Sequence, residues 1–325
     1  MGGGMSGAGA GLNARAWAIA DRLAAPEALQ RVAVRHLSNG ARVIDAGIAA
    51  QGGLGAGLAL AEICMGGLGR VNYRPVTIGG EAWAGVQVWT DHPAVSCMAS
   101  QYAGWAIQVD KYFAMGSGPL RAHARVEKEL FAKLGYTEHA ERGVLVLETR
   151  TPPGDAEAAW VARKAGLEPS QLTLVAAPTA SIAGTVQIIA RILETGLHKM
   201  DALGFDVNKV VSGIGTAPLP PVANHDLGAI GRTNDCILYG GQARYTVDAG
   251  DAELAALVPN LPASASKDYG TPFAEIFERY HGDFYQIDPL LFSPAEVWLT
   301  SVKSGKTYHA GQVNPEVLHT SLFAD

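Results

Sequence analysis

The sequence predicts a mixed α/β fold in which helices pack against at least one sheet. Short apolar runs with strand-like patterns alternate with longer runs that fit helices. Of the 325 residues, 48% are hydrophobic and only 17% are charged, which favours a well-buried chain over a disordered one. This length is ample for a hydrophobic core and indicates more than one domain.

The first half of the chain is predicted to begin with a helix and to continue with a hairpin. The helix covers residues 12–24 and ends before Pro26. Asn39-Gly40 separates two strand-like runs, 31–37 and 41–48, and this dipeptide is a strong hairpin signal. The other segments expected here are a helix over 58–65, strands over 85–89 and 94–99, helices over 101–108 and 120–134, and a strand over 143–148.

The clearest linker is the segment Thr151-Pro152-Pro153-Gly154-Asp155, which predicts an N-terminal α/β domain over 1–150 and a second over 151–325. A final hairpin is expected around Ser304-Gly305, and the segment from about 290 to 325 is predicted to pack back on the first domain. The other segments expected in the second half are helices over 156–165, 184–200 and 272–280, and strands over 172–176 and 237–247.

Charge and cysteine content exclude several classes of protein. Acidic residues number 31 and basic residues 25, so the net charge of −6 gives no footprint for nucleic acid or an anionic membrane surface. No apolar stretch approaches the roughly 20 residues of a membrane helix, and the start of the chain does not fit a secretion signal. Cys64, Cys97 and Cys236 lie far apart, which favours half-buried thiols in a cytoplasmic protein over disulfides.

Neither the glycines nor the histidines predict a cofactor or a metal. Gly52 to Gly57 follow a predicted strand, where a dinucleotide loop belongs, but the third glycine of that fingerprint is replaced by Leu58 or Leu60. None of the 9 histidines forms an i, i+4 pair suited to a metal ion. We therefore expect neither a nucleotide cofactor nor a metal site.

Arg191 and Glu194 are the two charged residues of the run Pro178–Glu194, which joins a polar turn to an apolar predicted helix. They lie three positions apart, so they share one helix face. Charges on a largely buried helix are costly unless they are paired, and a pair kept there is expected to face a cleft. A guanidinium and a carboxylate beside a loop could position and activate a water molecule. The same spacing also fits an ordinary helix salt bridge worth about 0.2–0.5 kcal/mol.

Long motifs spread over nearly the whole chain, from Asn39-Gly40 to residues 307–318, carry a specific family resemblance. The motifs are Cys64–Leu68 (CMGGL), Thr90–Ala94 (TDHPA), Ser100–Trp105 (SQYAGW), Lys111–Pro119 (KYFAMGSGP), Pro178–Glu194, Thr233–Asp235 (TND) and Asp283–Pro289 (DFYQIDP). Through them the sequence resembles the methenyltetrahydromethanopterin cyclohydrolases, in particular a bacterial, methylotroph-like branch that serves formaldehyde oxidation.

The resemblance implies two mixed α/β domains with the active-site cleft between them. It also implies a hydrolase that acts on a carbon–nitrogen bond of a cyclic amidine in one-carbon metabolism. Such an enzyme reversibly converts methenyl-tetrahydromethanopterin to formyl-tetrahydromethanopterin, with the pterin as substrate carrier and with no metal or prosthetic group. Members of the family are cytoplasmic homotrimers where their assembly is known.

The resemblance also assigns catalytic residues. The family's catalytic glutamate and its arginine neighbour correspond to Glu194 and Arg191, with Gln187 at the same flanking position. Archaeal members carry an assisting lysine where this chain has Tyr102. A phenol is neutral at pH 7 and can donate a hydrogen bond, but it supplies no fixed positive charge.

Six polar residues are candidates for contacts with the substrate, because hydroxyl, amide and carboxylate groups match the edge of a pterin. They are Ser117, Thr179, Ser181, Gln187, Asn234 and Asp235. Helix capping explains Thr179 and Ser181 equally well, and an Asx-turn or cap explains Asn234 and Asp235. Two other functions fit the same residues, namely a non-catalytic reduced-pterin-binding protein and a hydrolase of a related cyclic amidine such as a folate derivative.

Overall fold

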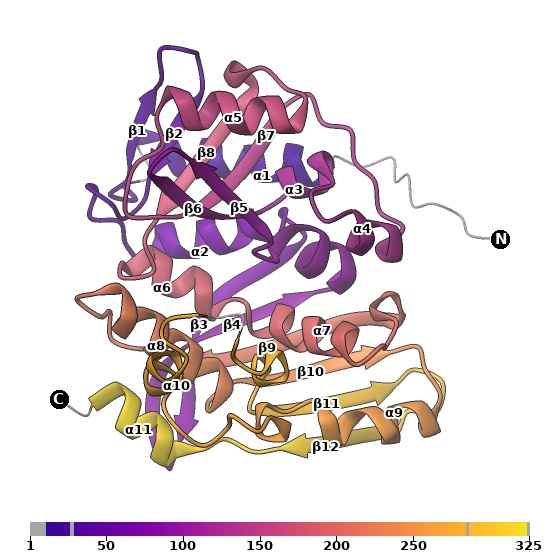
Figure 1. The fold of residues 1–325 in the computed structure, drawn as a ribbon. Coiled ribbons are helices and arrows are strands. Elements are labelled where there is room, and N and C mark those ends of the chain that lie inside the picture. Colours follow the sequence, from indigo (N-terminus) through magenta and orange to yellow (C-terminus); the bar gives the residue numbers. More distant parts are fainter. Residues whose placement is uncertain (1–10, 27–28, 284–285, 324–325) are drawn as a thin grey trace. The chain divides into compact units, whose positions relative to one another are not determined.

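The computed structural model describes residues 11–26, 29–283 and 286–323 (Figure 1). The chain forms two compact units, of which unit 1 comprises Met1–Gly69 and Val95–Gln187 and unit 2 comprises Arg70–Ala94 and Ile188–Asp325. Each unit contains a six-stranded sheet with parallel and antiparallel pairs, so the predicted mixed α/β class is confirmed. Phe284 and Tyr285, which belong to one of the sequence motifs, lie outside the described residues.

The sheet of unit 1 has the strand order β1-β2-β8-β7-β6-β5. Its central strands β2, β8 and β7 are parallel, whereas β1, β6 and β5 are antiparallel to their neighbours. The strands are β1 (Ala33–His36), β2 (Arg42–Asp45), β5 (Trp105–Val109), β6 (Tyr112–Ser117), β7 (Gly143–Glu148) and β8 (Leu172–Ala177). Buried parallel strands are expected to read as continuous apolar runs, as β7 and β8 do.

Helices cover both faces of this sheet, which makes unit 1 a three-layer structure (Figure 1). Alternate residues of β7 show the two faces. Val144 and Val146 pack with α1 (Leu12–Ala24) and α2 (Leu54–Cys64), whereas Leu145 and Leu147 pack with α5. The other helices of unit 1 are α3 (Leu120–Ala124), α4 (Lys128–Leu134), α5 (Asp155–Ala165) and the larger part of α6 (Ile182–Ile189).

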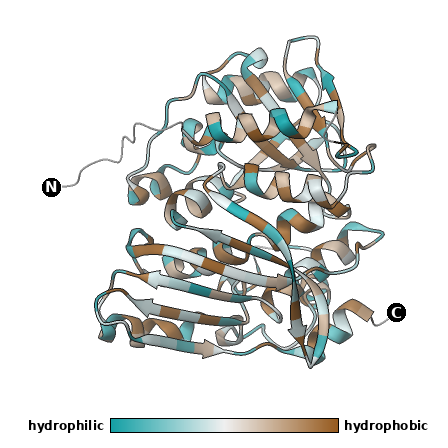
Figure 2. Cartoon of the chain, turned by 180° about the vertical axis from the view of Figure 1, so that it is seen from behind, coloured by the Kyte–Doolittle hydropathy of each residue, from teal (hydrophilic) through white to brown (hydrophobic). Residues whose placement is uncertain are grey.

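The sheet of unit 2 has the order β12-β11-β10-β9-β4-β3. Its strands are β3 (Gly69–Ile78), β4 (Glu81–Thr90), β9 (Val210–Pro218), β10 (Gln242–Val247), β11 (Glu296–Ser301) and β12 (Thr307–Gly311). Its helices are α7 (Ile192–Ala202), α8 (Asp226–Leu238), α9 (Asp251–Leu257), α10 (Phe273–Arg279) and α11 (Pro315–Phe323). The view from behind shows one face of this sheet with no helix over it (Figure 2). Among the described helices, none is long and apolar enough to cross a membrane.

The two units divide the chain at positions other than the predicted boundary after residue 150. The linker around Pro152 lies inside unit 1, because the strands on either side of it, β7 and β8, pair in parallel. Conversely, residues 70–94 contribute β3 and β4 to the sheet of unit 2. The predicted C-terminal hairpin is confirmed as β11 and β12, and it continues that same sheet through β10. Local composition marks a turn, whereas strand pairing decides which unit a segment joins.

Several elements agree with the sequence and several do not. The helix over 12–24 and the hairpin at Asn39-Gly40 are confirmed as α1 and β1-β2. The segment predicted as a strand over 94–99 is instead a π-helix, Ala94–Gln101, and the second half of the predicted helix over 101–108 is part of β5. The predicted long helix over 184–200 is interrupted between α6 and α7. Periodicity does not distinguish a short buried strand from a buried helix.

Candidate active site

Glu194 and Arg191 lie at the start of α7 and are both buried, with exposed fractions of 5% and 7%. The helix break places Arg191 at the N-cap of α7, with φ −81° and ψ 5°, and places Glu194 in the first turn. The single continuous helix predicted for these residues is therefore wrong, although their spacing is retained. A carboxylate in the first turn interacts favourably with the positive end of the helix dipole.

Close packing fixes the turn that carries Glu194 on the sheet of unit 2. A Cβ at Gly215 would lie 2.9 Å from Ile192 Cγ2, and a Cβ at Gly196 would lie only 2.2 Å from Tyr245 Oη. The same Tyr245 hydroxyl donates a hydrogen bond of 2.9 Å to the carbonyl oxygen of Leu193. Glycines on both partners thus let the backbone of α7 approach β9 and β10 closely, which orients the residues of its first turn.

In unit 1 the structure brings Ser117 and Gln187 together around a thiol. Cys64 Sγ lies 3.5 Å from Ser117 Oγ and donates to Gln187 Oε1 at 3.8 Å. All three side chains are buried. The sequence suggested only half-buried cysteines, whereas Cys64 is fully buried at the end of α2 and contacts two predicted site residues. The sequence feature that could have indicated Cys64 is its place in the CMGGL motif.

Tyr102 directly follows the π-helix of unit 1. Its backbone N–H donates to the carbonyl oxygen of Cys97 at 2.8 Å, which continues the i→i−5 pattern of that helix. Its side chain is half-buried, and the guanidinium carbon of Arg121 lies 5.1 Å from the centre of its ring. Segments of π-helix are frequent at functional sites, so Tyr102 remains a candidate site residue.

Thr179 and Ser181 lie in the turn that joins β8 to α6. Ser181 Oγ accepts from the N–H of Gly184 at 3.0 Å and donates to the carbonyl oxygen of Pro178 at 2.7 Å. The capping role considered for Ser181 is therefore observed. The Thr179 hydroxyl donates to the carboxylate of Glu148 at the end of β7. This turn follows the carboxyl end of β8, the edge at which α/β sheets bind ligands.

A loop at the end of the neighbouring strand β2 is organised by the carboxylate of Asp45. Both of its oxygens accept hydrogen bonds, from the backbone N–H groups of residues 47 and 48 and of residues 49 and 50, at 2.6–3.0 Å. Burial alone would raise the pKa of Asp45, but these four donors hold it below its usual value. A Cβ at Gly47 would lie 2.5 Å from Ser181 Oγ, so this loop packs tightly against the turn before α6.

Asn234 and Asp235 lie on α8 in unit 2. Asn234 Nδ2 donates to the carbonyl oxygen of Ile230 at 2.8 Å. Asp235 accepts from the N–H of Phe273 at 2.8 Å and from Ser321 Oγ at 2.5 Å, so it links α8 to α10 and α11. Burial raises the pKa of Asp235 to about 7, against the opposing effect of the two hydrogen bonds. The carboxylate is thus engaged in helix packing, and its contact with substrate stays a prediction.

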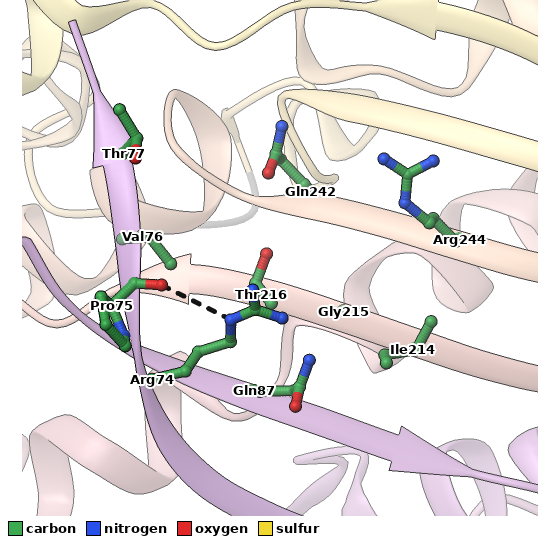
Figure 3. Close-up of a pocket in the computed structure, with 10 residues that line it drawn as sticks. All are labelled: Arg74, Pro75, Val76, Thr77, Gln87, Ile214, Gly215, Thr216, Gln242 and Arg244. Atoms are coloured by element: carbon green, nitrogen blue, oxygen red, sulfur yellow. Dashed lines mark hydrogen bonds between the residues drawn. The ribbon is translucent and has the colours of Figure 1, made fainter. Parts of the chain in front are cut away.

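A pocket of about 440 Å³ opens on the sheet of unit 2 (Figure 3). Its lining residues are Arg74, Pro75, Val76, Thr77, Gln87, Ile214, Gly215, Thr216, Gln242 and Arg244. None of the residues predicted for the site is among them. Within residues 11–26, 29–283 and 286–323, no cluster of three or more His, Cys, Asp or Glu side chains could hold a metal ion.

The chain matches known proteins over nearly its whole length. A family model described as Cyclohydrolase (MCH) matches residues 11–322. The chain belongs to this family. The methenyltetrahydromethanopterin cyclohydrolase of Methylobacillus flagellatus is 49% identical over 293 residues, which cover 90% of this chain and 89% of that protein. Proteins of the same name from Methylobacterium organophilum and Methanococcoides burtonii are 45% and 41% identical, and each alignment covers 96% of this chain and 97% and 98% of the relative. The family resemblance inferred from the motifs is confirmed.

Proposed function

We propose that this chain catalyses the reversible hydrolysis of methenyl-tetrahydromethanopterin to formyl-tetrahydromethanopterin. The observation that carries the proposal is the match over residues 11–322, together with relatives of 41–49% identity that bear the name of this activity. The enzyme is a hydrolase that acts on a carbon–nitrogen bond of a cyclic amidine.

The substrate already contains an electrophilic carbon, so the main task of the enzyme is proton transfer. The methenyl carbon is bonded to two nitrogens that share a positive charge, so it is already open to attack. Water forms a carbon–oxygen bond and gives up one proton, which leaves a neutral hydroxyl adduct. The bond to one nitrogen then breaks as that nitrogen receives a proton and the hydroxyl of the adduct gives up its own to become the formyl oxygen, so hydrolysis of the cation releases one proton to solvent overall. The formyl group remains on the other nitrogen, which belongs to the pterin ring. One carboxylate can accept the first proton and return it in the second step.

We assign that carboxylate to Glu194, which is buried in the first turn of α7. Arg191, at the N-cap of the same helix, would orient Glu194, and the carboxylate would attract the cationic substrate. Tyr102 would donate a hydrogen bond to the substrate. Ser117, Gln187, Thr179, Ser181, Asn234 and Asp235 are the proposed substrate contacts. Of these, Ser117 and Gln187 lie close together, because both side chains contact Cys64 in the interior of unit 1.

The direct test is turnover of the purified chain. Methenyl-tetrahydromethanopterin is supplied, loss of the methenyl absorbance is followed, and the formyl product is identified. Methenyl-tetrahydrofolate, supplied in parallel, tests the alternative of a folate-type substrate. Saturable binding of the methanopterin derivative without product would instead indicate a carrier or sensor and would refute the proposed reaction.

We also propose that the chain assembles as a homotrimer in the cytoplasm, where it would serve formaldehyde oxidation. Support for an interface comes from a row of side chains that crosses the helix-free face of the unit 2 sheet in register: Trp89, Ile214, Arg244, Trp298 and His309. Trp89 and Ile214 are 43% and 41% exposed, and aromatic residues and arginine are enriched in interfaces. Light scattering of the wild type and of Ile214→Glu would test this assembly, because an introduced charge should dissociate it. A wild-type monomer would refute the trimer.

A further inference from the structure

Arg121, on α3 in unit 1, is a fully buried arginine at the end of the π-helix. Its Nη1 lies 3.4, 3.5 and 3.1 Å from the carbonyl oxygens of Met98, Ala99 and Ser100. These are among the last residues of the π-helix Ala94–Gln101, and the end of a helix leaves carbonyl groups that accept from donors outside the helix, as Ser100 O also does from the N–H of Gly118 at 2.8 Å. A cation is favoured at this end of a helix because the carbonyl dipoles point toward it. Arg121 therefore caps the π-helix.

The remaining contacts of Arg121 compensate its charge and direct it toward Tyr102. Nε and Nη2 lie 3.0 and 2.8 Å from Glu127 Oε1, and the guanidinium carbon lies 5.1 Å from the centre of the Tyr102 ring. Phe131 lies near the same group, with its ring centre 5.9 Å away. A buried arginine without such partners would be strongly destabilising. With them, the positive charge of Arg121 is held next to the ring of Tyr102.

The Tyr102 ring is confined by the same group of residues. A Cβ at Gly104 would lie 1.8 Å from Glu127 Oε1 and 2.7 Å from Tyr102 Cε1, so no larger residue fits there without displacement. The backbone of Tyr102 is held through its hydrogen bond to Cys97. The position of Tyr102 therefore depends on the geometry of the π-helix, and Arg121 caps the end of that helix.

We propose that Arg121 is a positioning residue for Tyr102, which fixes the end of the π-helix and the orientation of the phenol ring while it keeps a positive charge next to that ring. The inference deepens the proposed function, because it rests on the role assigned there to Tyr102. Its physical basis is that a small misplacement of a group in contact with substrate can cost about 100-fold in rate.

The test is a double-mutant cycle of Arg121→Met and Tyr102→Phe, measured as kcat and KM for methenyl hydrolysis. Arg121→Lys is included because it restores the charge without the planar fork. Arg42→Met is the matched control, because Arg42 also lies over an aromatic ring, 4.8 Å from the centre of Trp17, and pairs with Asp21 at 2.6 Å. Thermal unfolding of every variant separates loss of fold from loss of rate.

Arg121→Met is expected to lower kcat by about 10- to 100-fold with little change in KM. Added to Tyr102→Phe, the same change should lower kcat by less than about twofold, since both substitutions remove one effect. Arg121→Lys should recover part of the loss, and Arg42→Met should lower only the unfolding temperature.

Losses that multiply in the double variant, or a folded Arg121→Met enzyme with wild-type kcat, would overturn the inference. If Arg121→Met does not fold, the same cycle is measured with Arg121→Lys and Glu127→Gln in its place. The criterion is again non-additivity with Tyr102→Phe. Wild-type kcat in Tyr102→Phe would remove Tyr102 from the reaction and the inference with it. The proposed reaction would stand in that case, because product formation by the wild type decides it separately.

Discussion

Tyr102 in unit 1 and Glu194 in unit 2 both follow a departure from regular α-helix, a π-helix before Tyr102 and a helix break before Glu194, but the two are held in different ways. The π-helix before Tyr102 is capped by a buried side-chain cation, Arg121. The turn that carries Glu194 is held by close packing, in which Gly196 and Tyr245 leave no room for an added methyl group. The support of Tyr102 thus includes a buried cation in addition to the close packing at Gly104, whereas the backbone turn that carries Glu194 is supported by close packing against β10.

This difference implies that the two regions respond to different substitutions. Changes of charge that preserve size should disturb the surroundings of Tyr102, and changes of size that preserve charge should disturb the turn of Glu194. The carboxylate of Glu194 itself is the exception, because it is assigned to the chemical step and not to the support.

The largest effect is therefore expected for Glu194→Gln, which keeps the shape of the side chain and removes the base. Its kcat should fall by about 10²- to 10⁴-fold, as for loss of a general acid–base group. The assay is loss of the methenyl absorbance under saturating substrate. Glu253→Gln is the control, because that carboxylate is exposed and pairs with Lys209. Near-wild-type turnover by a folded Glu194→Gln enzyme would show that Glu194 is not the base and that its turn has only a structural role.

Gly196→Ala tests the dependence on volume. The new methyl group would meet Tyr245 Oη, so α7 must shift, which we expect to cost about 1–3 kcal/mol in stability and about 10- to 100-fold in kcat. Tyr245→Phe removes the obstructing oxygen, so the double variant Gly196→Ala/Tyr245→Phe should recover much of the lost rate. Failure of this rescue, with both variants folded, would show that volume at this contact does not position Glu194.

How much of this arrangement the sequence predicts depends on how far apart the partners lie. Helix α1, the Asn39-Gly40 hairpin and the spacing of Arg191 and Glu194 follow from local patterns, and so could be predicted. The break before α7 could not be, because Ala190 and Arg191 carry no glycine or proline signal and α7 is placed by tertiary packing. The contact of Cys64 with Gln187 joins residues 123 positions apart, which no local pattern reveals. Arg121 was missed for the same reason, since its capping contacts are with backbone oxygens more than twenty positions away.

Two buried aspartates, one in each unit, differ in the direction in which their pKa values are shifted. Asp45 accepts hydrogen bonds from four backbone N–H groups, and its pKa lies below the ordinary value of 3.8. Asp235 has two donors and is more deeply buried, and its pKa rises to about 7. The number of donors relative to the depth of burial decides the direction.

Asp45→Asn should destabilise unit 1 by about 2 kcal/mol or more, because an amide replaces a charged acceptor and turns one acceptor oxygen into a donor. A lowered folded-state pKa contributes stability above the unfolded value, and this contribution is lost as pH falls through the folded value. The variant should therefore lose less stability than the wild type on acidification below about pH 4. Urea unfolding at pH 7 and along a series to pH 3 measures both effects. Asp21→Asn, at an exposed ion pair with Arg42, is the control, and equal effects of the two substitutions would contradict the special role of Asp45.

At pH 5, Asp235→Asn should have the smallest effect of these substitutions, and its dependence on pH should be opposite to that of Asp45→Asn. Because the folded-state pKa of about 7 exceeds the ordinary 3.8, the folded protein binds the extra proton between these values. The wild type therefore loses stability from this group as pH rises from about 4 to 7, whereas the neutral amide does not titrate. At pH 5 the two proteins should differ by less than about 1 kcal/mol, since Ser321 can reorient its hydroxyl to accept from the amide. As pH rises to 8, the free energy of unfolding of the variant, measured with urea, should therefore increase relative to that of the wild type. A difference that stays constant from pH 5 to pH 8 would mean that Asp235 is already ionised at pH 5, and that its two donors outweigh burial as the four donors of Asp45 do.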